Sequence, residues 1–277
     1  MCSTREFEIG SVPVGGSRPL FLIAGPCVIE SPEHCRMVAR ELKSITTRCD
    51  VPFIFKSSFD KANRTSSSSF RGPGLQQGLE VLGAVRGELQ IPVLTDIHEV
   101  EQVKPVAEVV DCLQIPAFLC RQTDLLRAAG QSGCAVNVKK GQFLAPWDME
   151  NVVRKLETSG CKRVLLTERG TSFGYNNLVV DMRSFPVMRQ WGWPVIYDVT
   201  HSLQLPGGQG RASGGQSQFI EDLARAGVGT GIDGLFLEVH ENPAKALSDG
   251  PNALPLERLE ALLRTLKQIH AIVNEAN

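Results

Sequence analysis

The sequence predicts an α/β protein of the (β/α)8-barrel class. Eight short runs of apolar, often β-branched residues alternate with eight segments of helical periodicity along the 277 residues. The runs are apolar at nearly every position, which is typical of parallel strands covered on both faces. Eight such units in a chain of this length fit a closed barrel. An open doubly wound sheet is the alternative, but it usually has a glycine-rich turn after its first strand, where this chain has Gly25-Pro26-Cys27.

Each predicted element has a local signal. Ser31 and Pro32 provide an N-cap and a first-turn proline for the first helix, and Asp124 and Asp148 lie where the dipole of a helix favours an anion. Residues 7–14 are expected to form a small β-hairpin that closes the bottom of the barrel. Composition shows no break, so 1–277 is expected to be one domain. We predict strands at 20–24, 52–56, 92–96, 112–115, 135–139, 163–167, 194–198 and 234–239, and helices at 32–48, 74–89, 100–108, 122–130, 147–159, 182–190, 214–227 and 255–274.

Composition narrows the function classes. The chain has 29 Lys and Arg against 30 Asp and Glu, which argues against a broad nucleic-acid surface. No apolar run approaches the roughly 20 residues of a membrane span, and no secretory signal is recognisable. The eight cysteines are scattered without a CxxC pair, which is typical of free thiols in a reducing compartment. We therefore expect a soluble, cytoplasmic protein with no nucleic-acid or membrane partner.

Basic side chains collect at the predicted strand ends. In a barrel these ends meet at one face, where active sites lie. Convergent cations in a neutral chain indicate a small substrate with several negative charges. The alternative is that they are solvated bases or ion pairs of the barrel mouth. The basic residues are Lys56, Lys61, Arg64, Lys139 and Arg169.

A second group suits a metal ion. Cys27 follows the first strand, His201 the seventh and Glu238 ends the eighth, while Asp249 lies in the turn beyond. These strands are neighbours in a closed barrel, and a thiolate, an imidazole and two carboxylates suit Zn²⁺, Fe²⁺ or Mn²⁺. Alternatively, Cys27 is a small buried residue and Asp249 caps a turn.

The glycine-rich segment 207–215 has two interpretations. Its backbone N–H groups, together with Ser213, could hold a phosphate at the start of the helix predicted from residue 214. Otherwise it is an exposed loop.

Long segments of the chain resemble 3-deoxy-D-manno-octulosonate 8-phosphate synthase, over roughly residues 7–275. Their number and order make the resemblance specific. The segments are 55–65 (FKSSFDKANRT), 70–75 (FRGPGL), 94–99 (LTDIHE), 113–119 (LQIPAFL), 121–125 (RQTDL), 136–140 (VNVKK), 173–182 (FGYNNLVVDM), 198–201 (DVTH) and 248–255 (SDGPNALP).

The resemblance implies a (β/α)8 barrel, usually a homotetramer, that condenses phosphoenolpyruvate with D-arabinose 5-phosphate and water for lipopolysaccharide synthesis. It implies that Lys61, Lys139 and Arg169 bind phosphoenolpyruvate, with Lys56 and Gln114 in the same pocket. The pentose phosphate is expected to contact Asn63, Arg64, Asp96 and Ser213.

The family has a metal-dependent class and a class with Asn at the Cys position. Cys27 places this chain with the first, which implies a Zn, Fe, Mn or Co ion held by Cys27, His201, Glu238 and Asp249. The mechanism expected from the resemblance has three parts: C3 of the enolpyruvate attacks the aldehyde, water adds at C2, and phosphate leaves by C–O cleavage. His201, Lys139 and Asp249 are the expected catalytic residues, and which group is the general acid or base stays open.

The sequence leaves three rival functions. 3-Deoxy-D-arabino-heptulosonate 7-phosphate synthase uses erythrose 4-phosphate in the same barrel, but it tends to have Lys-Pro-Arg where this chain has Lys61-Ala62-Asn63-Arg64. A Schiff-base aldolase would use Lys139 as its nucleophile. A sugar-phosphate sensor would bind without turnover.

Overall fold

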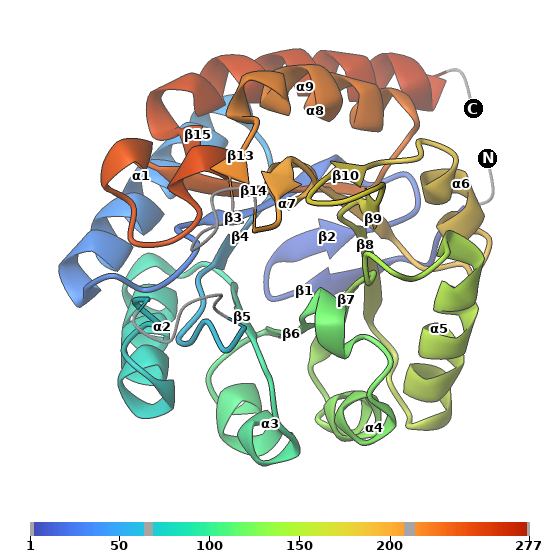
Figure 1. Ribbon diagram of the computed structural model, residues 1–277, viewed down its shortest axis with the longest axis horizontal. Coiled ribbons are helices and arrows are strands. Elements are labelled where there is room, and N and C mark those ends of the chain that lie inside the picture. Colours follow the sequence, from blue (N-terminus) through green and yellow to red (C-terminus); the bar gives the residue numbers. More distant parts are fainter. Residues whose placement is uncertain (1–2, 64–68, 208–213, 276–277) are drawn as a thin grey trace.

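The strands close into a parallel barrel, as predicted. The computed structural model describes residues 3–63, 69–207 and 214–275. Neighbouring strands pair in chain order, and β14 pairs with both the first and the last of the other barrel strands, which completes the ring (Figure 1). The barrel strands are β3 (Phe21–Gly25), β4 (Phe53–Lys56), β5 (Val93–Asp96), β6 (Cys112–Ile115), β7 (Ala135–Lys139), β8 (Val164–Glu168), β11 (Val195–Asp198) and β14 (Gly234–His240).

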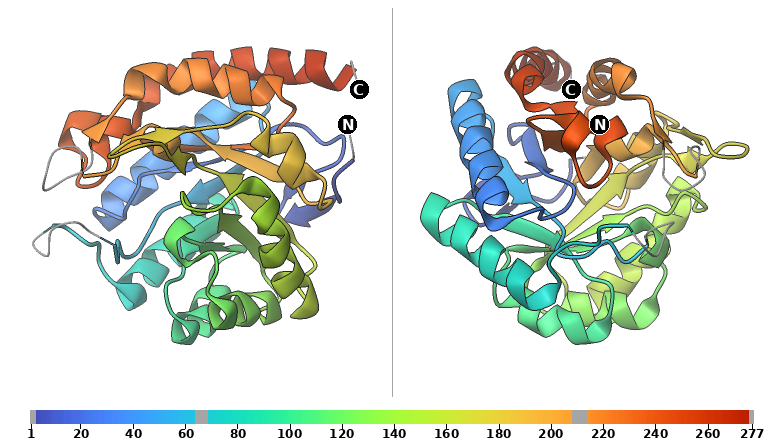
Figure 2. Two further views of the ribbon diagram at one scale, coloured as in Figure 1. Left: turned by 45° about the vertical axis from the view of Figure 1, so that its right-hand side comes forward. Right: turned by 60° about the vertical axis from the view of Figure 1, so that its left-hand side comes forward.

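Helices surround the barrel, as Figure 1 and both views of Figure 2 show. Most helix boundaries lie within two residues of those expected. A short turn, α7 (Val199–Ser202), directly follows β11 and was not predicted. The other helices are α1 (Pro32–Cys49), α2 (Leu75–Leu89), α3 (Val100–Ala107), α4 (Thr123–Gln131), α5 (Met149–Thr158), α6 (Ser184–Arg189), α8 (Ile220–Gly229) and α9 (Leu259–Glu275).

The loops at the mouth of the barrel contain short additional strands. β9 (Thr171–Ser172) pairs with β10 (Leu178–Val179), and β15 (Leu254–Pro255) extends from the end of β14. β12 (Gln204–Leu205) pairs with β13 (Gly214–Gly215).

The helix predicted from residue 214 was wrong at its start. Gly214 and Gly215 are extended in β13, and α8 begins only at Ile220, after a 3-10 turn at Ser217–Phe219. At Gly215 a Cβ would lie 2.1 Å from Asn252 Oδ1 and 2.5 Å from the carbonyl oxygen of Pro251. This close approach of two backbones uses the glycine for packing, so the described part of the loop offers no helix N-terminus to a phosphate. Ser213 lies outside the described residues.

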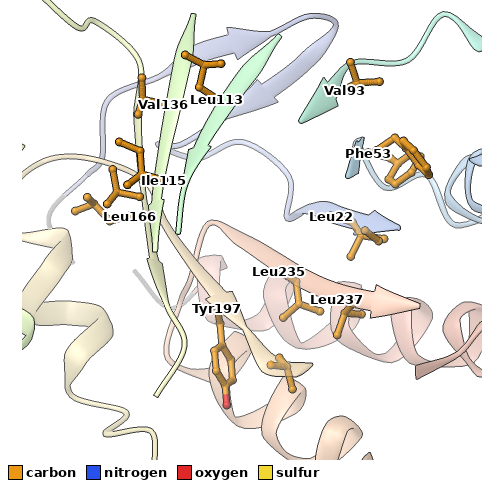
Figure 3. Packing of buried hydrophobic residues seen from close by; sticks show 14 of the residues in the cluster. Leu22, Phe53, Val93, Leu113, Ile115, Val136, Leu166, Tyr197, Leu235 and Leu237 are labelled. Carbon is orange, nitrogen blue, oxygen red and sulfur yellow. The ribbon is translucent and has the colours of Figure 1, made fainter. Parts of the chain in front are cut away.

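Apolar side chains fill both faces of the barrel wall. Toward the axis, Phe21, Ile54, Leu94 and Phe236 belong to one buried cluster. A larger cluster packs between the strands and the helices, and Figure 3 labels at least one member from every barrel strand. This two-sided burial explains why the strands are continuous apolar runs rather than alternating ones.

The N-terminal hairpin is present and plugs the bottom of the barrel. β1 (Phe7–Ile9) pairs with β2 (Val12–Val14), and Ile9, Val12 and Val14 are buried in the axial cluster. The hairpin therefore closes the end of the barrel opposite the carboxyl ends of the strands. No helix of the described segments is both apolar and long enough to cross a bilayer.

Candidate active site

A cavity of about 810 Å³ opens at the carboxyl ends of the strands. Its wall combines polar residues at the ends of β4, β5, β6 and β7 with residues that follow β8, β11 and β14. The barrel thus brings together positions that are far apart in sequence. Arg64 falls outside the described residues. Of the residues singled out in the sequence, Lys56, Lys61, Asn63, Asp96, Gln114, Lys139, Arg169, His201 and Asp249 line the cavity.

Asp198, at the end of β11, organises two of these residues. Its Oδ2 accepts hydrogen bonds from Lys139 Nζ at 2.6 Å and from His201 Nδ1 at 2.7 Å. Its Oδ1 accepts from the backbone N–H of His201 at 3.0 Å, which fixes the first turn of α7. Burial by itself would raise the pKa of Asp198, but His201 and Lys139 hold it far below its usual value. The ionised carboxylate therefore keeps hydrogen on Nδ1 of His201 and leaves Nε2 to face the site.

Lys56 and Glu238 form a second ion pair, across the inside of the barrel. Lys56 Nζ lies 2.9 Å from Glu238 Oε1, and both side chains are 1% exposed. Lys56 Nζ also donates to the carbonyl oxygen of Cys27 at 3.0 Å. Lys56 and Lys139 therefore form the ion pairs that were the alternative for the basic residues at the mouth. Their buried partners are the carboxylates of Glu238 and Asp198.

Asp96 is the end of a hydrogen-bonded row across neighbouring strands. Asn137 Nδ2 donates to Gln114 Oε1 at 2.8 Å, and Gln114 Nε2 donates to Asp96 Oδ1 at 2.5 Å. Ser58 Oγ donates to the other carboxylate oxygen. Burial would raise the pKa of Asp96, but Lys56 and the neighbouring ammonium groups hold it far below its usual range.

Arg169, just beyond β8, has a free donor. Its Nη2 donates to Gln204 Oε1 at 2.6 Å, and Gln204 Nε2 donates in turn to Asp249 Oδ1 at 2.8 Å. Its buried Nη1 has no hydrogen-bond partner within the described parts of the chain. An unsatisfied buried guanidinium nitrogen on a cavity wall suits an anionic ligand oxygen.

Lys61 adds positive charge to the same cavity. Burial would lower its pKa, but Cys27, Asp96 and the other acidic groups nearby raise it above its ordinary value, so the ammonium is charged. Its backbone N–H donates to the carbonyl oxygen of Arg71 at 2.7 Å, which anchors the loop at this point.

Three of the four predicted metal ligands converge. One donor atom each from Cys27, His201 and Glu238 lies within 4.8 Å of the other two, and all three residues are buried. Glu238 Oε2 is buried without a hydrogen-bond partner among the residues that the structure covers. A thiol, an imidazole nitrogen and an unsatisfied carboxylate oxygen form a donor set that fits a divalent cation.

Asp249 reaches this set through the thiol. Its Oδ2 accepts from Cys27 Sγ at 2.9 Å, and Ser248 Oγ lies 3.0 Å from the same sulfur. Burial and the negative charge of Asp249 raise the pKa of Cys27 to about 12. The thiol is therefore protonated in this arrangement, and a cation that bound there would release its proton.

A second cluster with histidines among the described residues does not suit a metal ion. Donor atoms of Glu30, His34 and His240 also lie within 4.8 Å of one another. However, the backbone N–H of Asn242 donates to His240 Nδ1 at 2.9 Å, so the hydrogen of the neutral imidazole sits on Nε2. That nitrogen is then a donor and no metal ligand. Glu30 Oε1 accepts from the backbone N–H of Leu247 at 2.9 Å, so we interpret the cluster as a tie that holds the loop bearing Asp249.

Sequence reasoning missed several residues of the site. Asp198 ends a strand beside His201, and its position was a usable signal. Gln204 and Ser58 had none, because hydrogen-bonding residues in loops are common and only the folded chain brings these two to Arg169 and Asp96.

Fold and site together define a class: a (β/α)8-barrel protein whose mouth collects cations for an anionic ligand beside a thiol-containing donor set. The sequence model of the DAHP synthetase I family matches residues 4–275, and the chain belongs to that family.

Similar proteins with curated names indicate which branch of the family this chain resembles. A 2-dehydro-3-deoxyphosphooctonate aldolase of Geobacter metallireducens is 64% identical over 98% of this chain and 99% of its own. Proteins with the same name from Trichlorobacter lovleyi and Geobacter sulfurreducens are 63% and 62% identical, again over 98% of this chain and 99% of theirs. The name denotes the eight-carbon branch that the resemblance predicted, rather than the seven-carbon rival.

Proposed function

We propose that this protein condenses phosphoenolpyruvate with D-arabinose 5-phosphate and water, giving 3-deoxy-D-manno-octulosonate 8-phosphate and inorganic phosphate. The observation that carries the proposal is near-full-length identity of 62–64% to proteins named 2-dehydro-3-deoxyphosphooctonate aldolase. The cationic cavity supports it independently, because both substrates are phosphorylated and one is also a carboxylate.

Phosphoenolpyruvate is the substrate we assign to Lys61, Lys139 and Arg169. Arg169 Nη1 is the buried donor without a partner in the described chain, and Lys61 is charged. A guanidinium and two ammonium groups match a carboxylate and a phosphate. Lys56 and Gln114 line the same cavity, and they are held by hydrogen bonds to Glu238 and Asp96.

Arabinose 5-phosphate is assigned to the open side of the cavity, with its hydroxyls toward Asp96 and Asn63. Its phosphate is assigned to Arg64 and Ser213, two residues outside the described ones. The arrangement would place the aldehyde carbon against C3 of phosphoenolpyruvate, and holding both anions in register supplies much of the rate.

Proton transfer is assigned to the group around His201, with Lys139 and Asp249. Asp198 holds hydrogen on Nδ1 of His201, so Nε2 is the nitrogen that exchanges a proton when no ion is bound and that would bind the ion when one is present. The carbon–carbon bond forms at the aldehyde, water oxygen adds at C2, and the C–O bond to phosphate breaks. The charge that shifts in this sequence lies against the fixed cations of the cavity.

A divalent ion (Zn, Fe, Mn or Co) is assigned to Cys27, His201, Glu238 and Asp249. The donor set and the unsatisfied Glu238 Oε2 support the assignment. When bound, such an ion supplies Lewis-acid polarisation of a substrate oxygen. Lys56 already places a positive charge 2.9 Å from Glu238 Oε1, so the ammonium and the ion share this carboxylate.

The Schiff-base alternative has one observation in its favour. Burial lowers the pKa of Lys139, which favours the neutral amine. Against it, Asp198 Oδ2 lies 2.6 Å from the same nitrogen and stabilises the ammonium. Borohydride with phosphoenolpyruvate or the pentose phosphate is therefore expected to leave the protein unmodified.

Assembly and location are further parts of the proposal. Aromatic side chains are exposed on the loops after β6, β7 and β8, which supports a homotetramer that covers them: Phe118, Phe143, Trp147, Phe173 and Tyr175. The seven described cysteines are all free thiols, which supports a cytoplasmic location. Light scattering on the purified protein tests the tetramer.

A phosphate-release assay tests the activity. With phosphoenolpyruvate, we expect phosphate release with arabinose 5-phosphate and little with erythrose 4-phosphate. Chelation is expected to lower the rate, and Mn²⁺ or Zn²⁺ to restore it. Turnover with erythrose 4-phosphate alone would overturn the choice of substrate, and binding without turnover would indicate a sensor.

A further inference from the structure

A third buried ion pair joins the tips of β7 and β8 behind the cavity wall. Lys140 Nζ lies 3.4 Å from Glu168 Oε1, and the two side chains are 0% and 2% exposed. Lys140 follows Lys139, and Glu168 precedes Arg169. Because successive side chains of a strand point to opposite faces, the pair faces the helices while Lys139 and Arg169 face the cavity.

Glu168 fixes the backbone that carries Arg169. Its Oε1 accepts hydrogen bonds from the backbone N–H groups of Arg169 at 2.9 Å and Gly170 at 2.7 Å. Gly170 has a φ of 92°, a conformation that other residues rarely adopt. The carboxylate thus holds the sharp turn in which the guanidinium of Arg169 leaves the strand.

Lys140 ties the loop after β7 to the segment after β8. Its Nζ donates to the carbonyl oxygen of Leu144 at 3.1 Å and to Thr171 Oγ1 at 3.1 Å. One ammonium therefore connects both strand tips and both loops, and it leaves little freedom for Lys139 to move relative to Arg169.

Stability alone does not call for such a pair. Two apolar side chains of similar volume stabilise a buried position as well as an ion pair or better, because charges lose their hydration on burial. What the charged pair adds here is a set of directed bonds to four backbone groups and one hydroxyl. Those bonds fix the relative position of the two strand tips, whereas they add little to the stability of the strand pairing.

We propose that Lys140 and Glu168 are positioning residues that set the separation of Lys139 and Arg169 for the carboxylate and phosphate of phosphoenolpyruvate. The inference rests on the proposed function of those two cations. Neither member of the pair lines the cavity, so their effect reaches the substrate only through Lys139 and Arg169.

Two double variants separate position from stability. Lys140→Met/Glu168→Gln and Lys140→Met/Glu168→Leu both remove the buried charges, but only Gln keeps a side-chain oxygen for the N–H groups of Arg169 and Gly170. We expect the KM for phosphoenolpyruvate to rise about tenfold or more in the Leu variant and about twofold or less in the Gln variant. The KM for arabinose 5-phosphate is expected to stay within about twofold in both.

Arg189 and Asp233 provide the matched control at the opposite end of the barrel. They form a buried ion pair of 3.1 Å, and Asp233 accepts from the backbone N–H of Val195 at 2.7 Å. Arg189→Met/Asp233→Leu is expected to lower the melting temperature and leave the KM for phosphoenolpyruvate unchanged. A parental KM in the Lys140/Glu168 Leu variant, or an equal rise for both substrates, would overturn the inference.

Single variants of cavity residues distinguish a failure of this inference from a failure of the proposed function. If Lys139→Gln and Arg169→Gln raise the KM for phosphoenolpyruvate while the Leu double variant does not, only the positioning role is wrong. If the two single variants leave that KM unchanged, both the assignment of the cations and the positioning role are wrong.

Discussion

Among single residues, Asp198 has the widest influence on the candidate site. One oxygen serves both Lys139 and His201, and the other holds the backbone of α7. Removing its charge would leave the ammonium of Lys139 buried without a full counter-charge and would release the imidazole from one tautomer.

The first prediction concerns this carboxylate. Asp198→Asn is expected to lower kcat about 10- to 100-fold. The neutral amide oxygen accepts hydrogen bonds from Lys139 and His201 more weakly than a carboxylate does, and the NH2 group is itself a donor that cannot accept from either of them. Steady-state phosphate release measures the effect. Asp233→Asn makes the same change in a buried carboxylate at the other end of the barrel, and its kcat is expected to match that of the parent. A parental kcat in Asp198→Asn would contradict the role.

The second prediction concerns the thiol. Cys27→Ala is expected to weaken binding of Zn²⁺ or Mn²⁺ to the metal-stripped protein about tenfold or more, as calorimetry of the metal titration would show. Cys35 is a buried thiol of α1 that belongs to the apolar cluster between the strands and the helices, and Cys35→Ala is expected to bind like the parent. Equal affinity in both variants would argue against Cys27 as a ligand.

At the scale of elements, the ends of the barrel strands and the segments that follow them carry the polar residues of the candidate site. Gly25, at the tip of β3, shows how closely the elements approach: a Cβ there would lie 1.8 Å from the carbonyl oxygen of Lys56 on β4. The tip of β3 must therefore be glycine, and Cys27 lies two residues further along the chain. The start of α1 then leads the chain away from the site.

The third prediction concerns this helix start. Ser31 Oγ accepts from the backbone N–H of His34 at 3.1 Å and caps α1. Ser31→Ala is expected to lower the free energy of unfolding by about 1 kcal/mol, measured by chemical denaturation. Thr47→Ala changes an exposed residue within the same helix and is expected to have little effect. Equal stability of Ser31→Ala and the parent would show that the cap contributes nothing.

For the whole molecule, stability depends on pH through buried histidines. Burial, with a further contribution from Arg189, lowers the pKa of His270 on α9. The unfolded chain then binds a proton near the ordinary histidine pKa of about 6.5 while the folded chain does not. Stability from this residue is therefore complete above that pH and falls as the pH decreases toward the folded pKa.

The fourth prediction follows from that sign. Between pH 7 and 5.5 the parent is expected to lose stability, with each such histidine contributing at most about 1.4 kcal/mol per pH unit. His270→Gln is expected to flatten the dependence, as denaturation curves at both pH values would show. His34→Gln serves as the comparison, a half-buried histidine at the mouth. An unchanged slope in His270→Gln would contradict the assignment.

The pattern of residues alone predicted most of the fold. Local periodicity and turn residues marked all eight barrel strands within one or two residues, because alternation of strand and helix is a short-range property of the chain. The error at Gly214–Gly215 has a long-range cause, the contact of β13 with Pro251 and Asn252. A glycine-rich segment does not reveal such a partner.

By itself, the sequence determined the barrel, the bottom hairpin and the set of polar residues at the strand ends. It did so because the carboxyl ends of parallel strands must share one face. Only the tertiary structure decided which charges meet. Lys56 pairs with Glu238 across 182 positions and Lys139 with Asp198 across 59, and each choice follows from barrel closure and side-chain reach rather than from any local pattern.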